Sequence, residues 1–453
     1  MSQIESYIVP GKRCHLVGIG GISMRALGEV LHGMGLIVSG SDMQESDAVK
    51  QLRSMGINVV IGHLPESVIG ADFVIRTAAV HDDNPEIASA LSLGIPVFER
   101  AQSWGSLMKS YKNALCISGT HGKTTTTSMA THILMEAGRD PTVMIGGILP
   151  ALGTSFRVGK SDTIVLESCE YCNSFLNFYP TIAVILNVEA DHLDFFKDLD
   201  DIVDSFKKFT ALTPASGTVV ANADDAGAML AAADTGRKLV TFGFSEDADV
   251  RGVNVADDSY SELDVEYNGQ VYCHLSLNVF GRHNASNALA ATAAAIVMGV
   301  SPEHISTGLA QFRGAGRRME YKGEFNGAKI YDDYAHHPSE ISATLTAVKA
   351  LPHNRIICAF QPHTYSRTRA LFDDFVTSLS LADITVLADI YAARESNTIG
   401  VSSAELAEHI PGCTYCGALN KVADHLKSII QPGDIVLTVG AGNIDSVADM
   451  LLK

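Results

Sequence analysis

Three features of the sequence predict an α/β protein with parallel sheets, divided into three domains. Short β-branched runs recur along the chain, and each is followed by a glycine-containing turn and then by a segment with the apolar spacing of a helix. This alternation is typical of parallel sheets whose strands are joined by crossover helices. The chain has 453 residues, which is too many for one ordinary core and leaves room for two or three domains.

The first cycle begins with the run CHLVGI at 14–19, which predicts a strand. The apolar residues of the segment that follows share one face of a helix, and these are Leu27, Val30, Leu31 and Met34. LIVSGSD is the second strand and ends at Asp42. The turn GIGGIS between strand and helix is similar to a dinucleotide-binding fingerprint, with an acid at the expected distance but with Ser23 in place of the third glycine. Two interpretations stay open, NAD binding and a tight turn without a ligand.

A second cycle opens with ALCIS at 114–118 and continues through the strands TIVLE (163–167) and IAVILN (182–187). A third cycle contains the expected strands AKIYDDY (328–334), IICAF (356–360), ITVLAD (384–389) and DIVLTVG (434–440). Polar or glycine-rich stretches at 109–113 and 313–318 are the natural boundaries. The predicted domains are therefore 1–112, 113–318 and 319–453.

A phosphate-binding loop lies between the first strand of the second cycle and its helix. The loop is Gly119-Thr120-His121-Gly122-Lys123-Thr124, with Thr125 next in the helix. Backbone N–H groups at such a helix N-terminus bind phosphate, while the lysine contacts the β- and γ-phosphates and the threonine hydroxyl binds magnesium. The general pattern requires glycine at 117, where this chain has Ile117, so the loop is a shortened variant. The alternative is an ordinary helix N-terminus capped by threonines.

Two further strands of this domain end in candidate magnesium ligands. Glu167 closes TIVLE, and His192 lies in the segment after IAVILN. Ligands of open parallel sheets bind at the carboxyl ends of the strands, so these side chains are expected beside the phosphate loop. A carboxylate oxygen suits magnesium. The alternatives are a solvated glutamate and a structural histidine.

Composition excludes some classes of function. The formal net charge of -18 argues against nucleic-acid binding and against attraction to anionic lipid. The chain has neither a signal-peptide pattern nor an apolar run long enough to span a membrane, so we expect a cytoplasmic protein. Most of the eight cysteines are expected to be reduced and buried, for example Cys14, Cys116 and Cys358. The pairs Cys169/Cys172 and Cys413/Cys416 lie about 240 residues apart, which does not favour a zinc site.

A series of ordered segments resembles the Mur ligase family over nearly the whole length of the chain. They are GIGGISM, GSD, SGTHGKTTTT, the block from Glu167 to Phe175, NVEADHLD, GRHNASNALAA, RRME, YDDYAHHPSEI with FQPHTYSRT, DIYAARE followed by GVSS, and VGAGNI. The resemblance implies an N-terminal Rossmann-like domain for a UDP-sugar, a central P-loop ATPase-like domain with a parallel sheet, and a C-terminal Rossmann-like domain that closes over ATP and brings the amino acid. YDDYAHHP with FQPHTYSRT points to members that add alanine.

The implied reaction joins L-alanine to the carboxylate of UDP-N-acetylmuramate, through an acyl phosphate made with ATP, in peptidoglycan precursor synthesis. By position, Lys123 holds phosphate, Thr124 and Glu167 bind one magnesium ion, and His192 helps to bind a second. The resemblance assigns ATP contacts in the later domains to His283, Asn284, Arg318 and Asp333. Gly18, Gly20, Gly21, Ser23, Ser41 and Asp42 are the expected UDP-sugar contacts.

The third domain brings candidate groups for the amino acid. His336 and Arg367 are the expected amino-acid contacts, because an arginine binds a carboxylate, and His337 is the candidate catalytic histidine for an amine that must lose its proton. His336 and His337 precede Pro338, so a simple helix entry is the alternative. A solvated surface position is the alternative for Arg367 and Arg369.

The chain departs from the family pattern at Cys169 and Cys172, where an acidic residue is expected, while Glu170 is retained. Three other functions remain to be separated from alanine ligation. They are attachment of a recovered peptide to the same sugar nucleotide, a catalytically silent nucleotide-binding partner of such ligases, and a dehydrogenase.

Overall fold

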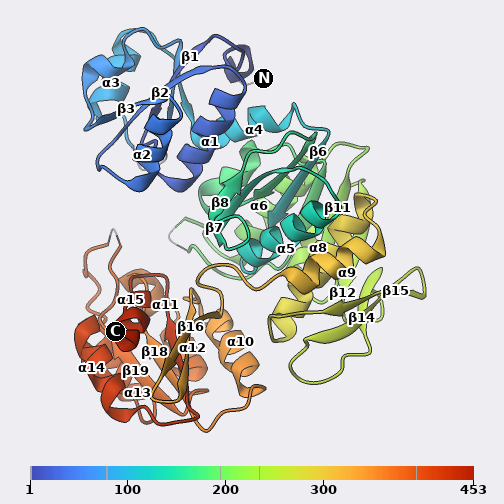
Figure 1. Cartoon of the computed structure of the whole chain (residues 1–453), viewed down its shortest axis with the longest axis vertical. Coiled ribbons are helices and arrows are strands. Elements are labelled where there is room, and N and C mark those ends of the chain that lie inside the picture. The colour runs from blue at the N-terminus through green and yellow to red at the C-terminus, as the bar shows by residue number, and fades with distance from the viewer. Residues whose placement is uncertain (1–2, 78–79, 194, 234, 394) are drawn as a thin grey trace. The chain divides into compact units, whose positions relative to one another are not determined.

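The computed structural model describes residues 3–77, 80–193, 195–233, 235–393 and 395–453, and it confirms an α/β fold with parallel sheets (Figure 1). Asp194 of NVEADHLD and Arg394 of DIYAARE lie outside the described residues. The chain forms two compact units, one of Met1–Phe242 with Ala290–His304 and the other of Gly243–Leu289 with Ile305–Lys453. The three predicted domains remain a prediction.

The first sheet of the N-terminal unit is parallel, with the order β3-β2-β1-β4-β5. Its strands are β1 (Arg13–Val17), β2 (Ile37–Asp42), β3 (Asn58–Ile61), β4 (Phe73–Arg76) and β5 (Val97–Glu99). Its helices are η1 (Gln3–Ser6), α1 (Ile22–Gly33), α2 (Asp47–Ser54), η2 (Pro65–Val68), α3 (Pro85–Ser92) and α4 (Arg100–Met108). Leu27, Val30 and Leu31 of α1 are buried, as their spacing predicts, and Met34 follows the end of the helix as its C-cap.

The second sheet of this unit contains the run β12-β11-β10-β6-β9-β7-β8. Only β8, at the edge, pairs antiparallel within this run. The strands are β6 (Asn113–Ser118), β7 (Thr142–Leu149), β8 (Thr154–Arg157), β9 (Thr163–Glu167), β10 (Ile182–Ile185), β11 (Thr218–Asn222) and β12 (Lys238–Gly243), and the helices are α5 (Lys123–Glu136), η3 (Tyr171–Asn177), α6 (Leu199–Ala211) and α7 (Ala226–Ala232). Strand β9 has the predicted limits.

Strand β10 is shorter than predicted, because it ends at Ile185 rather than at Asn187. The chain leaves the ladder here and turns toward the phosphate loop. The backbone N–H of Leu186 still donates to Ser118, and the carbonyl of Asn187 accepts from the N–H of Thr120 at 3.0 Å. The residues after the strand therefore support the loop instead of extending the sheet.

The C-terminal unit contains an antiparallel meander and a six-stranded sheet. The meander strands are β13 (Val250–Val253), β14 (Glu262–Tyr267) and β15 (Gln270–Ser276). The larger sheet has the order β16-β17-β21-β18-β19-β20 and is parallel except for the hairpin of β16 and β17. Its strands are β16 (Glu320–Phe325), β17 (Ala328–Asp333), β18 (Ile356–Phe360), β19 (Ile384–Ala388), β20 (Thr414–Gly417) and β21 (Ile435–Val439).

The helices of the later part of the chain complete the fold. They are α8 (Arg282–Val297), α9 (Pro302–Gln311), α10 (Pro338–Lys349), α11 (Tyr365–Ala370), α12 (Phe372–Leu379), α13 (Ser403–His409), α14 (Leu419–Ile429) and α15 (Asp445–Leu452). Buried aliphatic residues of β17, β18, β19 and β21 pack against α14 and α15 on one side of the six-stranded sheet and against α10 and α12 on the other. Such cover on both faces is typical of a parallel sheet with crossover helices.

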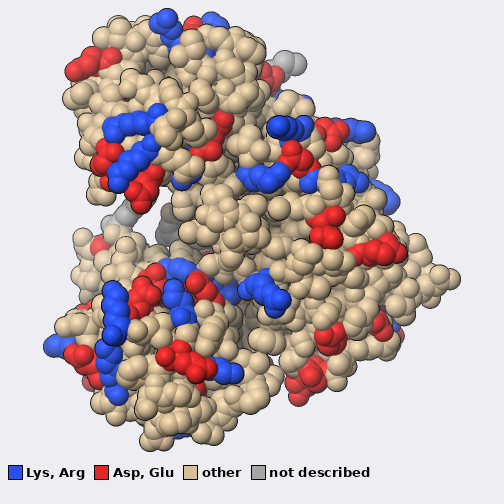
Figure 2. All heavy atoms as spheres, viewed as in Figure 1, with Lys and Arg blue, Asp and Glu red and all other residues tan. Residues whose placement is uncertain are grey.

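The surface and the cysteines agree with an ordinary globular protein. Acidic and basic side chains are interspersed on the face that Figure 2 shows. Among the described helices, none combines the length and the apolar character that a membrane span requires. Cys14, Cys116 and Cys358 are buried, as predicted, whereas Cys169 and Cys172 are exposed, and all eight cysteines are free thiols.

Candidate functional site

The phosphate loop joins β6 to α5 in a conformation that requires its glycines. Gly122, the N-cap of α5, has a φ of 81°, in the left-handed region. Gly119 packs so closely on the next strand end that an added Cβ would lie 2.9 Å from the Cβ of Leu186. The side-chain amide of Asn187 accepts from the N–H of His121 at 2.7 Å and donates to the carbonyl of His121 at 3.2 Å. Asn187 therefore clamps the loop.

Lys123, the first residue of α5, is held by carbonyls and by a buried carboxylate. Its Nζ donates to the carbonyls of Gly119 and Thr120 and lies 3.0 and 3.2 Å from the two carboxylate oxygens of Glu170, which is only 2% exposed. Burial acts to lower the pKa of Lys123, but Glu170 and the other nearby anionic groups outweigh it and the pKa lies above its usual value. Lys123 is thus a charged group paired inside the site.

The predicted magnesium ligands Thr124 and Glu167 are in contact. The Thr124 hydroxyl donates to Glu167 Oε1 at 3.0 Å, and the backbone N–H of Gly146, on β7, donates to Glu167 Oε2 at 2.6 Å. A hydroxyl in the first turn of α5 beside a carboxylate at the carboxyl end of β9 provides oxygen donors of the kind that magnesium prefers. The residues present therefore fit this ion.

His192 lies close to Glu170, the carboxylate that is paired with Lys123. Its Nε2 is 3.7 Å from Glu170 Oε1 and 3.8 Å from Asp191 Oδ2, and its ring centroid is 4.6 Å from that of Tyr171. The backbone of His192 has a φ of 54°, which is uncommon for a residue with a side chain and marks a constrained position. Glu170 thus links Lys123 to His192. Its importance was not predicted from the sequence, which gave no sign that it would be buried.

The remaining loop residues complete this end of the sheet. Thr120 donates its hydroxyl to the carbonyl of Glu189 at 3.4 Å, and His121 Nε2 lies 3.4 Å from the Glu189 carboxylate. Thr125 is buried in the first turn of α5. Their ATP contacts remain predictions.

The glycine-rich turn after β1 uses its own amides to hold its shape. The N–H groups of Gly18 and Ile19 both donate to the carbonyl of Ser41 at 2.9 Å, and the N–H of Gly20 donates to Asp42 Oδ2 at 2.8 Å. The N–H of Gly21 donates back to Gly18 at 3.2 Å. The backbone N–H groups of the turn thus have partners, whereas the N–H groups in the first turn of α1 have none within the helix. Gly21, the N-cap, supplies no side-chain cap.

Ser41 anchors this turn to a buried cluster of charged and polar groups. Its hydroxyl donates to Glu86 Oε2, which also lies 2.9 Å from His63 Nδ1. His15 Nε2 is 3.4 Å from Glu86 Oε1, and Glu86 is fully buried. Burial acts to raise the pKa of Glu86, but the nearby His15 and His63 rings and the hydrogen bond from Ser41 outweigh it, so the pKa lies below its usual value.

We expect Glu86→Ala to weaken the first sheet by roughly 2–4 kcal/mol, because it leaves buried polar groups without their partner. Hydrogen exchange of the amides of β1 and β2 measures this local stability. Since the pKa of Glu86 is lowered by folding, its contribution is complete above the unfolded pKa and is lost as the pH falls through the folded value. The exposed Glu66→Ala is the control, and equal exchange rates in the two variants would contradict the assignment.

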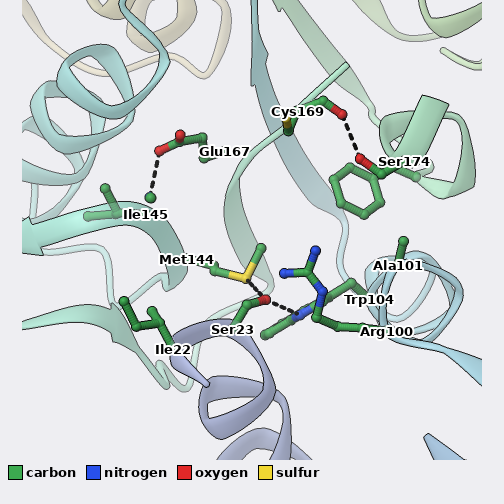
Figure 3. A pocket seen from close by; sticks show the side chains of 12 residues that line it. Ile22, Ser23, Arg100, Ala101, Trp104, Met144, Ile145, Glu167, Cys169 and Ser174 are labelled. Atoms are coloured by element: carbon green, nitrogen blue, oxygen red, sulfur yellow. Dashed lines mark hydrogen bonds between the residues drawn. The ribbon is translucent and has the colours of Figure 1, made fainter. Parts of the chain in front are cut away.

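One cavity of about 310 Å³ in the N-terminal unit is lined by residues of α1, α4, β7 and β9 and of the segment after β9 (Figure 3). It is lined by Ile22, Ser23, Arg100, Ala101, Trp104, Met144, Ile145, Gly146, Glu167, Cys169, Ser174 and Phe178. The indole N–H of Trp104 donates to the Ser23 hydroxyl at 3.2 Å, which in turn donates to the Met144 sulfur at 2.9 Å. A predicted UDP-sugar contact, Ser23, and a predicted metal ligand, Glu167, therefore line the same cavity. Arg100 and Trp104 were not predicted.

In the C-terminal unit, several predicted ATP contacts lie around Glu340. Arg318 Nη1 is 3.9 Å from Glu340 Oε1, and the guanidinium lies over the ring of Tyr334. Asp333 accepts from two backbone N–H groups, and burial raises the pKa of its carboxyl to about 6. Burial lowers the pKa of His283 to about 4, so this histidine is neutral at pH 7. Asn284 is buried and donates to the carbonyl of Phe280 at 2.8 Å.

The histidine pair begins helix α10, as the helix-entry alternative expects. His337 is the N-cap and forms a capping box with Glu340, which also accepts from the N–H of His336 at 2.9 Å. Arg367 Nη1 lies 3.2 Å from His363 Nδ1. Arg369 instead forms an exposed ion pair with Glu405 at 3.2 Å, which fits the surface alternative.

Comparison with known proteins places this geometry in a family. The model described as "Mur ligase family, catalytic domain" matches residues 13–112, "Mur ligase middle domain" matches 117–295, and "Mur ligase, glutamate ligase domain" matches 317–442. A UDP-N-acetylmuramate–L-alanine ligase of Caldanaerobacter subterraneus subsp. tengcongensis is 46% identical over 448 residues, covering 98% of this chain and 97% of its own.

Two solved structures of ligases are similar to this chain over nearly its whole length. The UDP-N-acetylmuramate-alanine ligase of Thermotoga maritima has a TM-score of 0.79 and 30% identity, covering 97% of this chain and 98% of its own. A murein peptide ligase of Psychrobacter arcticus has a TM-score of 0.71 at 24% identity, covering 98% of each chain, and this likeness shows the fold alone.

Proposed function

The chain belongs to the Mur ligase family, and on that premise we propose that it is an ATP-dependent ligase joining L-alanine to the carboxylate of UDP-N-acetylmuramate. The reaction belongs to peptidoglycan precursor synthesis in the cytoplasm. The observation that carries the proposal is the shared cavity. Ser23 of the predicted UDP-sugar turn and Glu167 of the predicted magnesium site line the same space, and Glu167 is in contact with the phosphate loop through Thr124.

Lys123 is the group that neutralises the phosphates of ATP in this proposal. It is already charged and is held by Glu170, so the arriving phosphate oxygens replace a carboxylate as its partner. Positioning and charge neutralisation account for most of the catalysis of phosphoryl transfer. The buried Glu170 therefore keeps Lys123 in place until ATP binds.

Thr124 and Glu167 would hold one magnesium ion, and His192 would help to hold a second. Magnesium at this point supplies positive charge that stabilises the developing charge of the transferred phosphoryl group. The chain's own contribution is to orient these ligands. The N–H of Gly146 holds one oxygen of Glu167, and the ring of Tyr171 lies against that of His192.

The carboxylate of the sugar nucleotide must be activated because a carboxylate resists attack by an amine. Its oxygen attacks the γ-phosphorus of ATP, ADP leaves, and an acyl phosphate forms. The alanine amine then attacks the carbonyl carbon and loses a proton, the C–O bond to the phosphate breaks, and inorganic phosphate leaves with that oxygen. We assign the alanine contacts to His336 and Arg367, proton removal to His337, and charge neutralisation to Arg318, with His283, Asn284 and Asp333 at the ATP.

A ligase that attaches a peptide to the same sugar nucleotide is the second candidate, favoured by the likeness to a UDP-N-acetylmuramate:L-alanyl-gamma-D-glutamyl-meso-diaminopimelate ligase of Neisseria meningitides, which has 28% identity and a TM-score of 0.61 and covers 68% of this chain and 100% of its own. To separate the two, the protein is incubated with ATP, magnesium and UDP-N-acetylmuramate, and with either L-alanine or the tripeptide. Mass spectrometry should find the alanine amide together with ADP. A peptide product without an alanine product would reject alanine ligation, and ATP left intact would reject a ligase altogether.

A further inference from the structure

Arg100 is the first residue of α4 and extends its guanidinium into the cavity of Figure 3. It follows Glu99, whose carboxylate accepts from Arg76 Nε at 2.7 Å and also caps α4. The acid next to Arg100 in the sequence is therefore already bonded to another arginine.

Across the described part of the chain, the structure gives the Arg100 guanidinium neither a hydrogen bond nor an ion pair. Burial lowers the pKa of Arg100, while Cys169 and Glu99 act in the opposite direction. A guanidinium stays charged in proteins, and a charge withdrawn from water is costly unless an anion accompanies it. The other charged residue of the cavity wall is Glu167, and its two oxygens accept from Thr124 and Gly146. Arg100 is thus a half-buried charged side chain in the cavity wall, and none of the described residues is its hydrogen-bond or ion-pair partner.

The same cavity wall contains Ile22 and Ser23, the first two residues of α1. The first-turn N–H groups of a helix have no partner within the helix, and they favour an anion through the helix dipole. The amides of the turn before α1 already have partners, because they donate to Ser41 and Asp42 at the end of β2 and to the carbonyl of Gly18. An anion between α1 and Arg100 would therefore meet the first-turn N–H groups on one side and a forked guanidinium on the other.

We propose that Arg100 is a substrate-binding residue that holds the diphosphate of the UDP-sugar together with the first turn of α1. This inference rests on the proposed function. The diphosphate, rather than the muramate carboxylate, is the anion assigned to Arg100, because the carboxylate must reach the phosphate loop on the Glu167 side of the cavity. A guanidinium also matches two oxygens of a phosphate group at once.

The test measures binding of UDP and of UDP-N-acetylmuramate to the full chain by calorimetry. Arg100→Gln should weaken both ligands by the same factor, about 10- to 100-fold, as expected for loss of a charge-assisted hydrogen bond. Arg100→Lys should bind both ligands with an affinity between those of Arg100→Gln and of the wild type. In turnover, Arg100→Gln should raise KM for the sugar nucleotide and leave KM for ATP and for alanine unchanged.

Lys160→Gln is the matched control, because it removes one positive charge from an exposed position near the opposite end of β9. If Arg100→Gln binds UDP and UDP-N-acetylmuramate as tightly as the wild type does, the proposed role of Arg100 is overturned. Weakening of UDP-N-acetylmuramate with unchanged UDP would also overturn it, by assigning Arg100 to the carboxylate. A wild-type protein that binds UDP but not UDP-N-acetylmuramate would instead refute the proposed function.

Discussion

Lys123→Ala should abolish ligation, lowering kcat by roughly 10³-fold or more, because Lys123 is the only lysine or arginine of the phosphate loop at 119–124. The same change should also destabilise the protein without ATP, by about 3–5 kcal/mol, because it leaves Glu170 buried without its counter-ion. Release of ADP measures the first effect and thermal unfolding of the ligand-free protein measures the second.

A second variant separates catalysis from folding. Lys123→Ala combined with Glu170→Gln removes both charges of the buried pair, so thermal stability should largely return while activity stays lost. The exposed Lys208→Ala is the control and should behave as the wild type. Recovery of ligation in the double variant would show that Lys123 acts only through the fold, and would reject its contact with phosphate.

Glu167→Gln should lower kcat by roughly 10²- to 10³-fold at ordinary magnesium concentrations, since it removes the charge of the carboxylate that lies against Thr124. The amide keeps the size of the side chain, so the sheet should remain folded. Titration of magnesium at saturating ATP measures the effect, and a higher magnesium requirement is expected. Glu66→Gln, at an exposed position of η2, is the control. An unchanged magnesium requirement would remove Glu167 from the metal site.

The sequence predicted those parts of the fold that depend on local pattern. Strand β9, the phosphate loop and the buried face of α1 follow from β-branched runs, a fixed glycine spacing and helical periodicity. Thr124 and Glu167 meet as expected, because parallel strands end at the same edge of a sheet.

Other features arise only from tertiary packing. Glu170 lies in an irregular segment, and nothing local showed that it would be buried against Lys123 and His192. No motif marked Arg100 or Glu86 in the sequence. In the structure Arg100 lines a cavity, and Glu86 lies between His15 and His63. The antiparallel strands β8, β13, β14, β15 and β16 were not predicted either, since alternating cycles favoured parallel pairing throughout.

The central claim is that the γ-phosphate of ATP activates the muramate carboxylate for amide formation. The most direct test uses UDP-N-acetylmuramate labelled with ¹⁸O in that carboxylate, together with ATP, magnesium and L-alanine. Mass spectrometry of the inorganic phosphate should find one ¹⁸O atom for each amide formed, because the carboxylate oxygen leaves with the phosphate of the acyl phosphate. Amide formed with unlabelled phosphate would contradict the claim.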